Sequence, residues 1–177
     1  MPALSTERLI LRHWRPPDRE PFARINADPT VMEYFPSLLT RSESDSLAER
    51  IEDGLSVENF GFWAAELRST SKFIGFIGLN TPSFTAAFTP CVEIGWRLAA
   101  AHWGHCLATE GARAAAHYAF ATLKIPELVA FTVPGNLRSR RVMEKLGMSH
   151  NPRDDFDHPL LPEGHSLRRH VLYRLLQ

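Results

Sequence analysis

The sequence is poor in cysteine, in net charge and in long apolar runs, and each shortage excludes a class of protein. Its 177 residues include two cysteines, Cys91 and Cys106, too few for a disulfide framework and typical of reduced thiols. Lys and Arg number 20 and so do Asp and Glu, so the basic excess of nucleic-acid binders is missing. No apolar run approaches a membrane span, and the first residues lack the pattern of a secretory signal. We therefore expect a cytoplasmic protein without nucleic-acid or membrane partners.

A metal site is also disfavoured by the spacing of possible ligands. His102, His105 and Cys106 are close in sequence, but no second Cys/His pair follows at the spacing of a zinc site. Neighbouring side chains in a turn point in different directions. We therefore expect no metal.

What remains is ordinary globular composition, 44% hydrophobic and 23% charged, enough for one sizeable core. Apolar or alternating runs predict six strands, at residues 8–12, 62–67, 73–79, 92–98, 127–133 and 169–176. No repeat, linker or break in composition divides the chain. We therefore expect a single domain over residues 1–177.

Four segments between these strands predict helices. Asp18 is placed to cap the first, and Thr40 and Glu43 form a capping box for the second. The other two helices are expected over residues 107–123 and 136–146. The apolar residues expected to face the core from the first two helices are Phe22, Ile25, Leu47, Ile51 and Leu55. Strands punctuated by helices predict one mixed α/β (α+β) domain.

The most informative segment is the turn at residues 103–111, directly after the strand expected at 92–98. A helix that begins at such a turn leaves its first N–H groups unpaired, and with the helix dipole they can hold a phosphate or pyrophosphate. Gly104 lets the backbone approach an anion where a Cβ would obstruct it. Taken alone, Gly104 could equally serve only to turn the chain.

A second segment, residues 136–148, makes the pair of motifs much more specific. Together the two segments resemble the GNAT superfamily of acyl-CoA-dependent N-acyltransferases. Residues 7–12, 73–79, 93–96 and 170–174 resemble its RimJ/RimL-type branch, which includes ribosomal-protein N-terminal alanine acetyltransferases and many small-molecule acetyltransferases. The resemblance implies a GNAT fold, with a mixed, mostly antiparallel sheet of about six to seven strands and about four flanking helices.

The resemblance further implies acetyl-CoA as co-substrate, with its pyrophosphate held mainly by main-chain N–H groups. In the family's turn pattern, Gln/Arg-x-x-Gly-x-Gly/Ala, only Gly104 is intact here, since Ala101 and Cys106 stand at the other positions. Asn136 could serve only as a helix cap, and each arginine nearby could simply be solvated. The expected cofactor contacts are Trp96, Leu98, Trp103, Gly104, His105, Cys106, Leu107, Ala108, Thr109, Asn136, Arg138 and Arg141.

Two residues are candidates for the chemistry. Ser139 shares a helical face with apolar residues, and in the family this position lies near the acyl-CoA sulfur, where a hydroxyl could donate to the departing thiolate. The alternative is a hydroxyl bonded to a helix carbonyl. The tyrosine acid of many GNAT enzymes is absent, because Met143 stands at its position. The sequence leaves open whether Ser139, water or neither protonates the thiolate.

Glu93 is the candidate base. Only a neutral amine attacks, and at pH 7 a lysine ε-amine is almost fully protonated, whereas an α-amine is partly neutral. Glu93 is an acidic residue in an otherwise apolar strand, and in this branch the matching glutamate faces the acceptor and acts through water. The alternative is a structural carboxylate that bonds main chain or pairs with an arginine such as Arg97.

For the acceptor, the resemblance singles out the aromatic loop at residues 31–36 and the polar segment before the last strand. The expected contacts are Tyr34, Phe35, Trp63 and His158, although core packing or a solvated loop would also explain them. We thus predict direct attack of a primary amine, on a peptide, a protein or a small molecule, in a ternary complex. A homodimer is plausible from the family. The rival readings are an inactive CoA-binding regulatory protein and transfer of a different acyl group.

Overall fold

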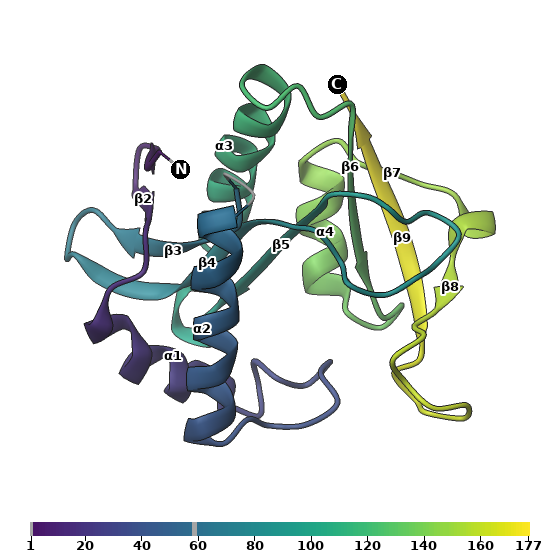
Figure 1. Cartoon of the computed structure of the whole chain (residues 1–177), viewed down its shortest axis with the longest axis horizontal. Helices are drawn as coiled ribbons and strands as arrows, with labels where there is room; N and C mark the ends of the chain where they lie inside the picture. The colour runs from purple at the N-terminus through teal and green to yellow at the C-terminus, as the bar shows by residue number, and fades with distance from the viewer. Residues whose placement is uncertain (1, 58–59) are drawn as a thin grey trace.

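A mixed sheet forms the frame of the protein in the computed structural model, which describes residues 2–57 and 60–177 (Figure 1). In the described residues its order is β1-β2-β3-β4-β5-β6-β9-β7, with β8 paired to β9. Only β5 and β6 pair in parallel; the other neighbours are antiparallel. The strands are β1 (Leu4–Ser5), β2 (Leu9–Arg12), β3 (Phe62–Leu67), β4 (Lys72–Asn80), β5 (Glu93–Leu98), β6 (Glu127–Thr132), β7 (Ser149–His150), β8 (Phe156–Asp157) and β9 (Arg169–Leu176).

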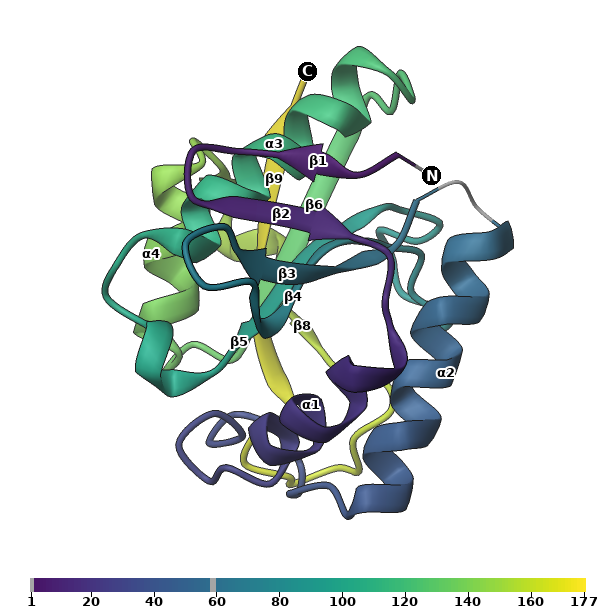
Figure 2. The ribbon, with the colours of Figure 1, turned by 90° about the vertical axis from the view of Figure 1, so that its left-hand side faces the viewer.

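Helices cover both faces of this sheet, as the two ribbon views show (Figure 1, Figure 2). They are α1 (Arg19–Asn26), α2 (Arg41–Val57), α3 (Leu107–Ala121) and α4 (Leu137–Lys145), with short 3-10 turns η1 (Pro16–Asp18), η2 (Ala100–His102) and η3 (Pro152–Asp154). The six long strands and the four helices agree with the expected mixed, mostly antiparallel fold. The strands β1, β7 and β8 were not predicted, because two residues are too few to show a period.

Strand alternation sends side chains into two separate cores. On one face, Ile94 and Leu98 of β5 join the buried residues of α3 in the larger core. On the other face, Phe76 of β4 packs with Phe22 and Ile51 from α1 and α2. Both predicted helical faces are therefore correct where the side chains are described; Leu55 lies outside that set.

The capping box of α2 is confirmed: the Thr40 N–H donates to the Glu43 carboxylate at 2.8 Å, and the Glu43 N–H donates to Thr40 Oγ1 at 3.3 Å. Asp18, in contrast, is not a side-chain cap of α1. Its carboxylate instead accepts the Arg15 N–H at 2.8 Å and two hydrogen bonds from Arg12 at 2.7 and 2.9 Å. Asp18 itself has helical backbone angles, φ −74° and ψ −22°, whereas a residue that caps a helix with its side chain is typically extended.

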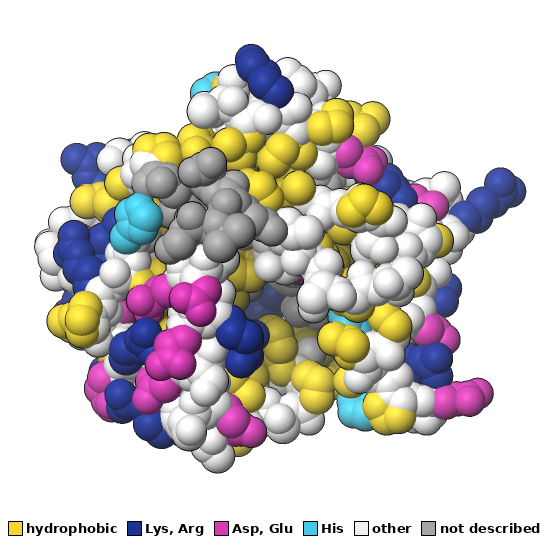
Figure 3. Space-filling model, in the orientation of Figure 1, with side chains coloured by type: hydrophobic (Ala, Val, Ile, Leu, Met, Phe, Trp, Pro, Cys, Tyr) yellow, Lys and Arg dark blue, Asp and Glu magenta, His cyan; other side chains and the backbone are white. Residues whose placement is uncertain are grey.

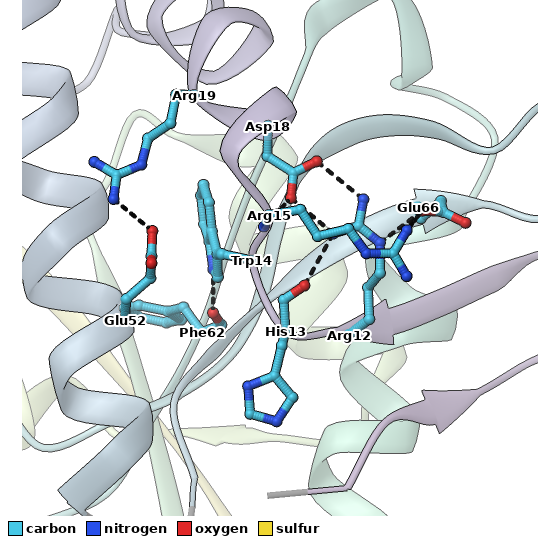
Figure 4. A network of polar contacts seen from close by, with 9 residues as sticks. All are labelled: Arg12, His13, Trp14, Arg15, Asp18, Arg19, Glu52, Phe62 and Glu66. Atoms are coloured by element: carbon cyan, nitrogen blue, oxygen red, sulfur yellow. Dashed lines mark hydrogen bonds and ion pairs between the residues drawn. The ribbon is translucent and has the colours of Figure 1, made fainter.

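Arg12 is the centre of a buried ionic network that fixes α1 on the sheet (Figure 4). Its Nε donates to Glu66 of β3 at 2.6 Å while its other nitrogens hold Asp18, and all three residues are at most 7% exposed. Nearby, Arg19 of α1 donates to Glu52 of α2 at 2.7 Å (Figure 4). The network therefore sets where α1 and α2 lie over the sheet.

The strands β5 and β6 separate almost as soon as they meet. Their register contains a single Cα pair, Glu93 opposite Val129, and one further bond joins the Val129 N–H to the Val92 carbonyl. Beyond that point each strand leaves the other, and α4 begins in the chain after β6 (Figure 1). The gap between the strands is where the main cavity of the protein opens.

No helix within residues 2–57 and 60–177 is long and apolar enough to cross a membrane.

Candidate active site

A cavity of about 710 Å³ runs from the start of α3, past the separated strands, to the loop at residues 31–36. Figure 3 shows the molecule hollowed near the middle of one face, with hydrophobic side chains around the hollow. One end of the cavity is lined by the turn before α3 and the first turns of α4. The other end is lined by β5, the 31–36 loop and the segment at residues 158–170.

The turn before α3 presents a row of unpaired main-chain donors. Cys106 precedes the helix in the left-handed conformation, at φ 60°, and the first bond of the helix runs from the Glu110 N–H to the Cys106 carbonyl. In the described part of the chain, the N–H groups of Leu107, Ala108 and Thr109 have no acceptor. All three residues line the cavity. Their N–H groups and the helix dipole suit an anion such as a pyrophosphate.

Gly104 occupies a position in this turn whose backbone conformation favours glycine. Its φ is +78°, which L side chains rarely adopt, and a Cβ built there meets no heavy atom within 4 Å. The turn is held in place from behind, since Arg8 donates to the His105 carbonyl at 3.0 Å and binds Glu110 of α3 at 2.7 Å. His105 itself is exposed and lies outside the cavity lining, unlike the other predicted cofactor contacts.

The start of α4 brings Ser139 to the cavity wall. Asn136 caps the helix, because its Oδ1 accepts the Ser139 N–H at 3.2 Å and its Nδ2 donates to Thr132 Oγ1 at 3.0 Å. No partner for the Ser139 hydroxyl occurs among the described residues, so the alternative of a back-bond to a helix carbonyl is not observed. Met143, one turn further on, is 1% exposed and carries no proton to donate.

Cationic side chains surround the cofactor end of the cavity. Arg141 and Lys145 of α4 both line it, and the Lys145 Nζ lies 3.4 Å from Cys106 Sγ. Arg138 lies with its guanidinium 4.6 Å from the Trp103 ring centroid and donates to Glu33 at 2.6 Å. Arg138 thus joins the turn before α3 to the 31–36 loop, across the cavity. The position of Lys145 at the cavity was not predicted. A lysine in the last turn of a helix is usually explained by its favourable interaction with the helix dipole.

Glu93 lies where β5 and β6 part, in the wall between the two ends of the cavity. Its Oε2 accepts a hydrogen bond from Asn80 Nδ2 at 3.1 Å, and the described residues place no cation beside it. Burial among protein atoms raises the pKa of its carboxyl from 4.5 to about 7, only partly opposed by the Asn80 bond. The alternative pairing with Arg97 does not occur, since Arg97 Nη1 donates to Asn26 at 2.6 Å. Glu93 therefore titrates near neutral pH and faces the cavity.

On the acceptor side, Tyr34, Phe35 and His158 line the cavity as predicted. Trp63 does not, and the prediction for it was wrong. It is fully buried on the opposite face of the sheet, where its ring packs against Tyr118 with centroids 5.7 Å apart. Its neighbour Phe62 lines the cavity instead, because successive residues of a strand point to opposite faces.

Two cavity residues on the acceptor side were missed by sequence reasoning. Arg97 is one of them, two residues beyond Gly95 on the face of β5 that also presents Glu93. His170 of β9 is the other, with its ring centroid 5.0 Å from that of His158. Burial lowers the pKa of both imidazoles, so both are neutral at pH 7. Side chains alternate along a strand, so the position of Arg97 four residues after Glu93 was a signal in the sequence that both lie on one face.

Groups of three or more His, Cys, Asp or Glu able to hold a metal ion do not occur in residues 2–57 and 60–177. The chemistry available in the cavity is thus that of a carboxyl titrating near pH 7, a serine hydroxyl and a set of main-chain donors. These groups suit transfer of a group from a phosphate-bearing donor to a nucleophile that must lose a proton.

Comparisons with known proteins agree on one family. Residues 8–149 match the family model described as the acetyltransferase (GNAT) domain. The chain is 34% identical to the protein YkkB of Bacillus subtilis over 152 residues, 84% of this chain and 86% of that one. It is 31% identical to the FsC-acetyl coenzyme A-N(2)-transacetylase of Aspergillus fumigatus over 159 residues, 84% of this chain and 66% of the relative. Among solved structures, an acetyltransferase from Agrobacterium tumefaciens superposes with a TM-score of 0.80 at 28% identity, over 100% of this chain and 95% of that one.

Proposed function

Since the chain belongs to the GNAT acetyltransferase family, we propose that it moves an acetyl group from acetyl-CoA to a primary amine by direct attack in a ternary complex. The observation that carries this proposal is Glu93, a half-buried residue whose carboxyl has a pKa of about 7 in the wall of the cavity. At neutral pH a large fraction of this carboxyl is deprotonated and able to accept a proton from an ammonium group.

The cofactor end of the cavity fits acetyl-CoA. The N–H groups of Leu107, Ala108 and Thr109 can donate to the pyrophosphate, and Arg141 and Lys145 supply positive charge beside it. When bound, the cofactor supplies an activated acetyl thioester. The separated edge of β5, with Trp96 and Leu98 in the lining, leaves main-chain groups without a strand partner along the cavity.

Two steps fall to the protein. Glu93 accepts the proton of the acceptor ammonium, directly or through one water, so that the neutral nitrogen can attack. The Ser139 hydroxyl donates a hydrogen bond to the sulfur as negative charge develops there. Met143 stands where an acid would otherwise be found, and Ser139 is the one hydroxyl of α4 that lines the cavity in the described residues.

A covalent route through Cys106 is disfavoured. Its side chain is exposed at the phosphate turn and lies beside Lys145, at the end of the cavity away from Glu93. A thiol there is remote from the base that would have to activate it and deprotonate the amine.

We also assign the chain to the RimJ/RimL-like branch, on the strength of Glu93, Ser139 and the motifs around them. The A. fumigatus relative is named for transfer from acetyl coenzyme A to a nitrogen, which supports an N-acetyltransferase here. The cytoplasmic location and the homodimer stay predictions.

The proposal is tested by an acceptor screen. Acetyl-CoA is mixed with the protein and with amino acids, peptides and small amines, and release of free CoA thiol is followed. Thiol release that requires both the protein and an amine is the expected result. Glu93→Gln is the control, and should release thiol much more slowly with the same amine. Tight binding of acetyl-CoA without transfer to any amine would instead identify a CoA-binding regulatory protein.

A further inference from the structure

Arg97 is an arginine held inside the acceptor end of the cavity. Its guanidinium carbon lies 4.1 Å from the ring centroid of Phe35 and 5.4 Å from that of Phe76. Its Nη1 donates to the Oδ1 of Asn26, and the Asn26 amide in turn donates to Ser44. Two aromatic rings and a neutral amide thus fix the guanidinium in one place.

No carboxylate neutralises Arg97 among the described residues. Ten other arginines form ion pairs with Asp or Glu in the described residues, whereas Arg97 forms none. Its Nε–H is buried without a hydrogen-bond partner. Burial alone lowers the pKa of the guanidinium to about 10, with no acid to oppose the effect. The Arg97 side chain is half-buried and has no counter-ion, which is unfavourable for a cation, so the site is poised to accept an anion.

The fold leaves Nη2 of Arg97 as the donor for such an anion. Nη1 donates to Asn26, and Nε is closed off by protein atoms, whereas Nη2 has no partner in the part of the chain that is described. A hydrogen bond from this charged nitrogen to a carboxylate is stronger than one between neutral groups. The nearest candidate within the loop, Glu33, already pairs with Arg138.

Glu93 and Arg97 lie on the same face of β5, so one acceptor can reach both. Four residues of strand separate their Cα atoms by about 13 Å. Between them, Gly95 adds no side chain; a Cβ there would come 3.0 Å from the Phe62 ring and narrow the passage. The Glu93 carboxyl covers part of this distance, since its Oε1 lies 3.7 Å from the position of that Cβ. For the remaining span we expect an acceptor with several bonds between nitrogen and carboxylate to fit better than an α-amino acid, which has two.

We propose that Arg97 binds a carboxylate of the acceptor, so that the preferred substrate is a primary amine with a carboxylate several bonds from its nitrogen. This inference rests on the proposed acetyl transfer for its chemistry. The amine nitrogen lies at Glu93 and the carboxylate at Arg97, with the apolar wall of Phe62 and Phe76 along the chain between them. Arg97 is thus a specificity-determining residue.

The first test compares matched acceptors on the wild-type protein. Each pair differs only in charge: 6-aminohexanoate against 6-aminohexanamide, and 4-aminobutyrate against 4-aminobutanamide. Glycine against glycinamide is the short pair. We expect kcat/KM about tenfold or more higher for the longer carboxylates than for their amides, as one hydrogen-bonded ion pair provides. The short pair should show no such preference. Equal rates within the longer pairs would overturn the inference and leave the proposed function standing.

A peptide pair identifies the source of the carboxylate. Ala-Glu amide against Ala-Gln amide places the charge on a peptide side chain near a free α-amine. A preference for the Glu peptide in addition to that for the ω-amino acids supports a peptide side chain as a source of the carboxylate, and equal rates on the two peptides support a small molecule.

The second test changes Arg97. Arg97→Met keeps an unbranched chain between Phe35 and Phe76 but removes the charge, and Arg97→Lys keeps a charge without the planar guanidinium. Arg24→Met, on the exposed face of α1, is the matched control. We expect Arg97→Met to remove the preference for carboxylates while the rates on the amides change less than about threefold, and Arg97→Lys to restore part of it. A uniform loss on every acceptor would show that Arg97 only supports the fold.

Binding measurements separate this inference from the proposed function. Calorimetry with 6-aminohexanoate should show binding by the wild type and much weaker binding by Arg97→Met, whether or not acetyl transfer follows. Arg97-dependent binding without transfer to any amine would support the anion site and overturn the proposed reaction. Neither binding nor transfer would overturn both.

Discussion

Replacing Glu93 with glutamine should make the protein more stable and less active, and both effects should depend on pH. Glutamine keeps the size of the side chain and can still accept the hydrogen bond from Asn80, which is 3.1 Å long in the wild type. What it removes is the ionisable group. The two consequences follow from the same raised pKa.

The stability effect follows from linkage. The pKa of Glu93 is about 7 in the folded protein against an ordinary 4.5. Below pH 4.5 the carboxyl is protonated in both the folded and the unfolded state, and it does not lower the free energy of unfolding. Between pH 4.5 and 7 it ionises first in the unfolded state, so the free energy of unfolding falls over this range. At about 1.4 kcal/mol per pKa unit, the loss reaches on the order of 3 kcal/mol above pH 7. Glu93→Gln should therefore match the wild type near pH 4 and be more stable by up to about 3 kcal/mol at pH 8.

The activity effect follows from the base. With an acceptor that is protonated at the assay pH, wild-type kcat/KM should fall about tenfold for each pH unit below 7, as Glu93 takes up its proton. Glu93→Gln should lower kcat/KM by about 10²–10⁴-fold at neutral pH, and its remaining rate should rise with the neutral fraction of the amine up to the pKa of the acceptor. The deficit should shrink once pH exceeds the pKa of the acceptor, because a neutral amine needs no base.

The assay is kcat/KM against pH for both proteins, with urea unfolding at the same pH values. A variant that is less stable at pH 8, with a deficit in rate that is equal at every pH, would refute the reasoning. Glu93 would then be a structural carboxylate, and bulk water would deprotonate the amine.

Three further changes have distinct expected results. Ser139→Ala should lower kcat by about ten- to a hundredfold with little change in the dissociation constant of acetyl-CoA, since one hydrogen bond to a developing charge is lost; an unchanged kcat would assign Ser139 to packing. Gly104→Asp should weaken acetyl-CoA binding in calorimetry, because it adds a negative charge at the turn in a backbone conformation, φ +78°, that favours glycine; wild-type affinity would place the cofactor elsewhere. Arg12→Leu should lower the free energy of unfolding by about 3–5 kcal/mol, because the buried carboxylates of Asp18 and Glu66 lose the guanidinium that they share; a loss below about 1 kcal/mol in urea unfolding would show that the network contributes little.

The parts of the site that could be predicted are those whose signal is local in the sequence. The turn at Gly104, the cap at Asn136 and the lone acid at Glu93 each follow from neighbouring residues, and the structure brings all three to one cavity. The six long strands and four helices were likewise readable from periodicity and caps.

The predictions that failed depended on which face of a strand a side chain occupies and on partners far away in the sequence. Trp63 and Phe62 are adjacent, and nothing local says which of two aromatic residues in a strand faces the cavity. Asp18 looked like a helix cap, but its partner Arg12 belongs to the preceding strand. Arg97 was interpreted from the sequence as a partner for Glu93, because its actual neighbour, Asn26, lies at the end of a helix far away in the chain.

The most direct test of acetyl transfer to an amine follows the label in a single turnover. The protein is mixed with acetyl-CoA that carries an isotopically labelled acetyl group and with an amine found in the screen, and the protein and the small molecules are then examined separately by mass spectrometry. The account predicts label on the amine nitrogen and none on the protein at any time. Label that remains on CoA with every amine, or that appears first on Cys106, would contradict it.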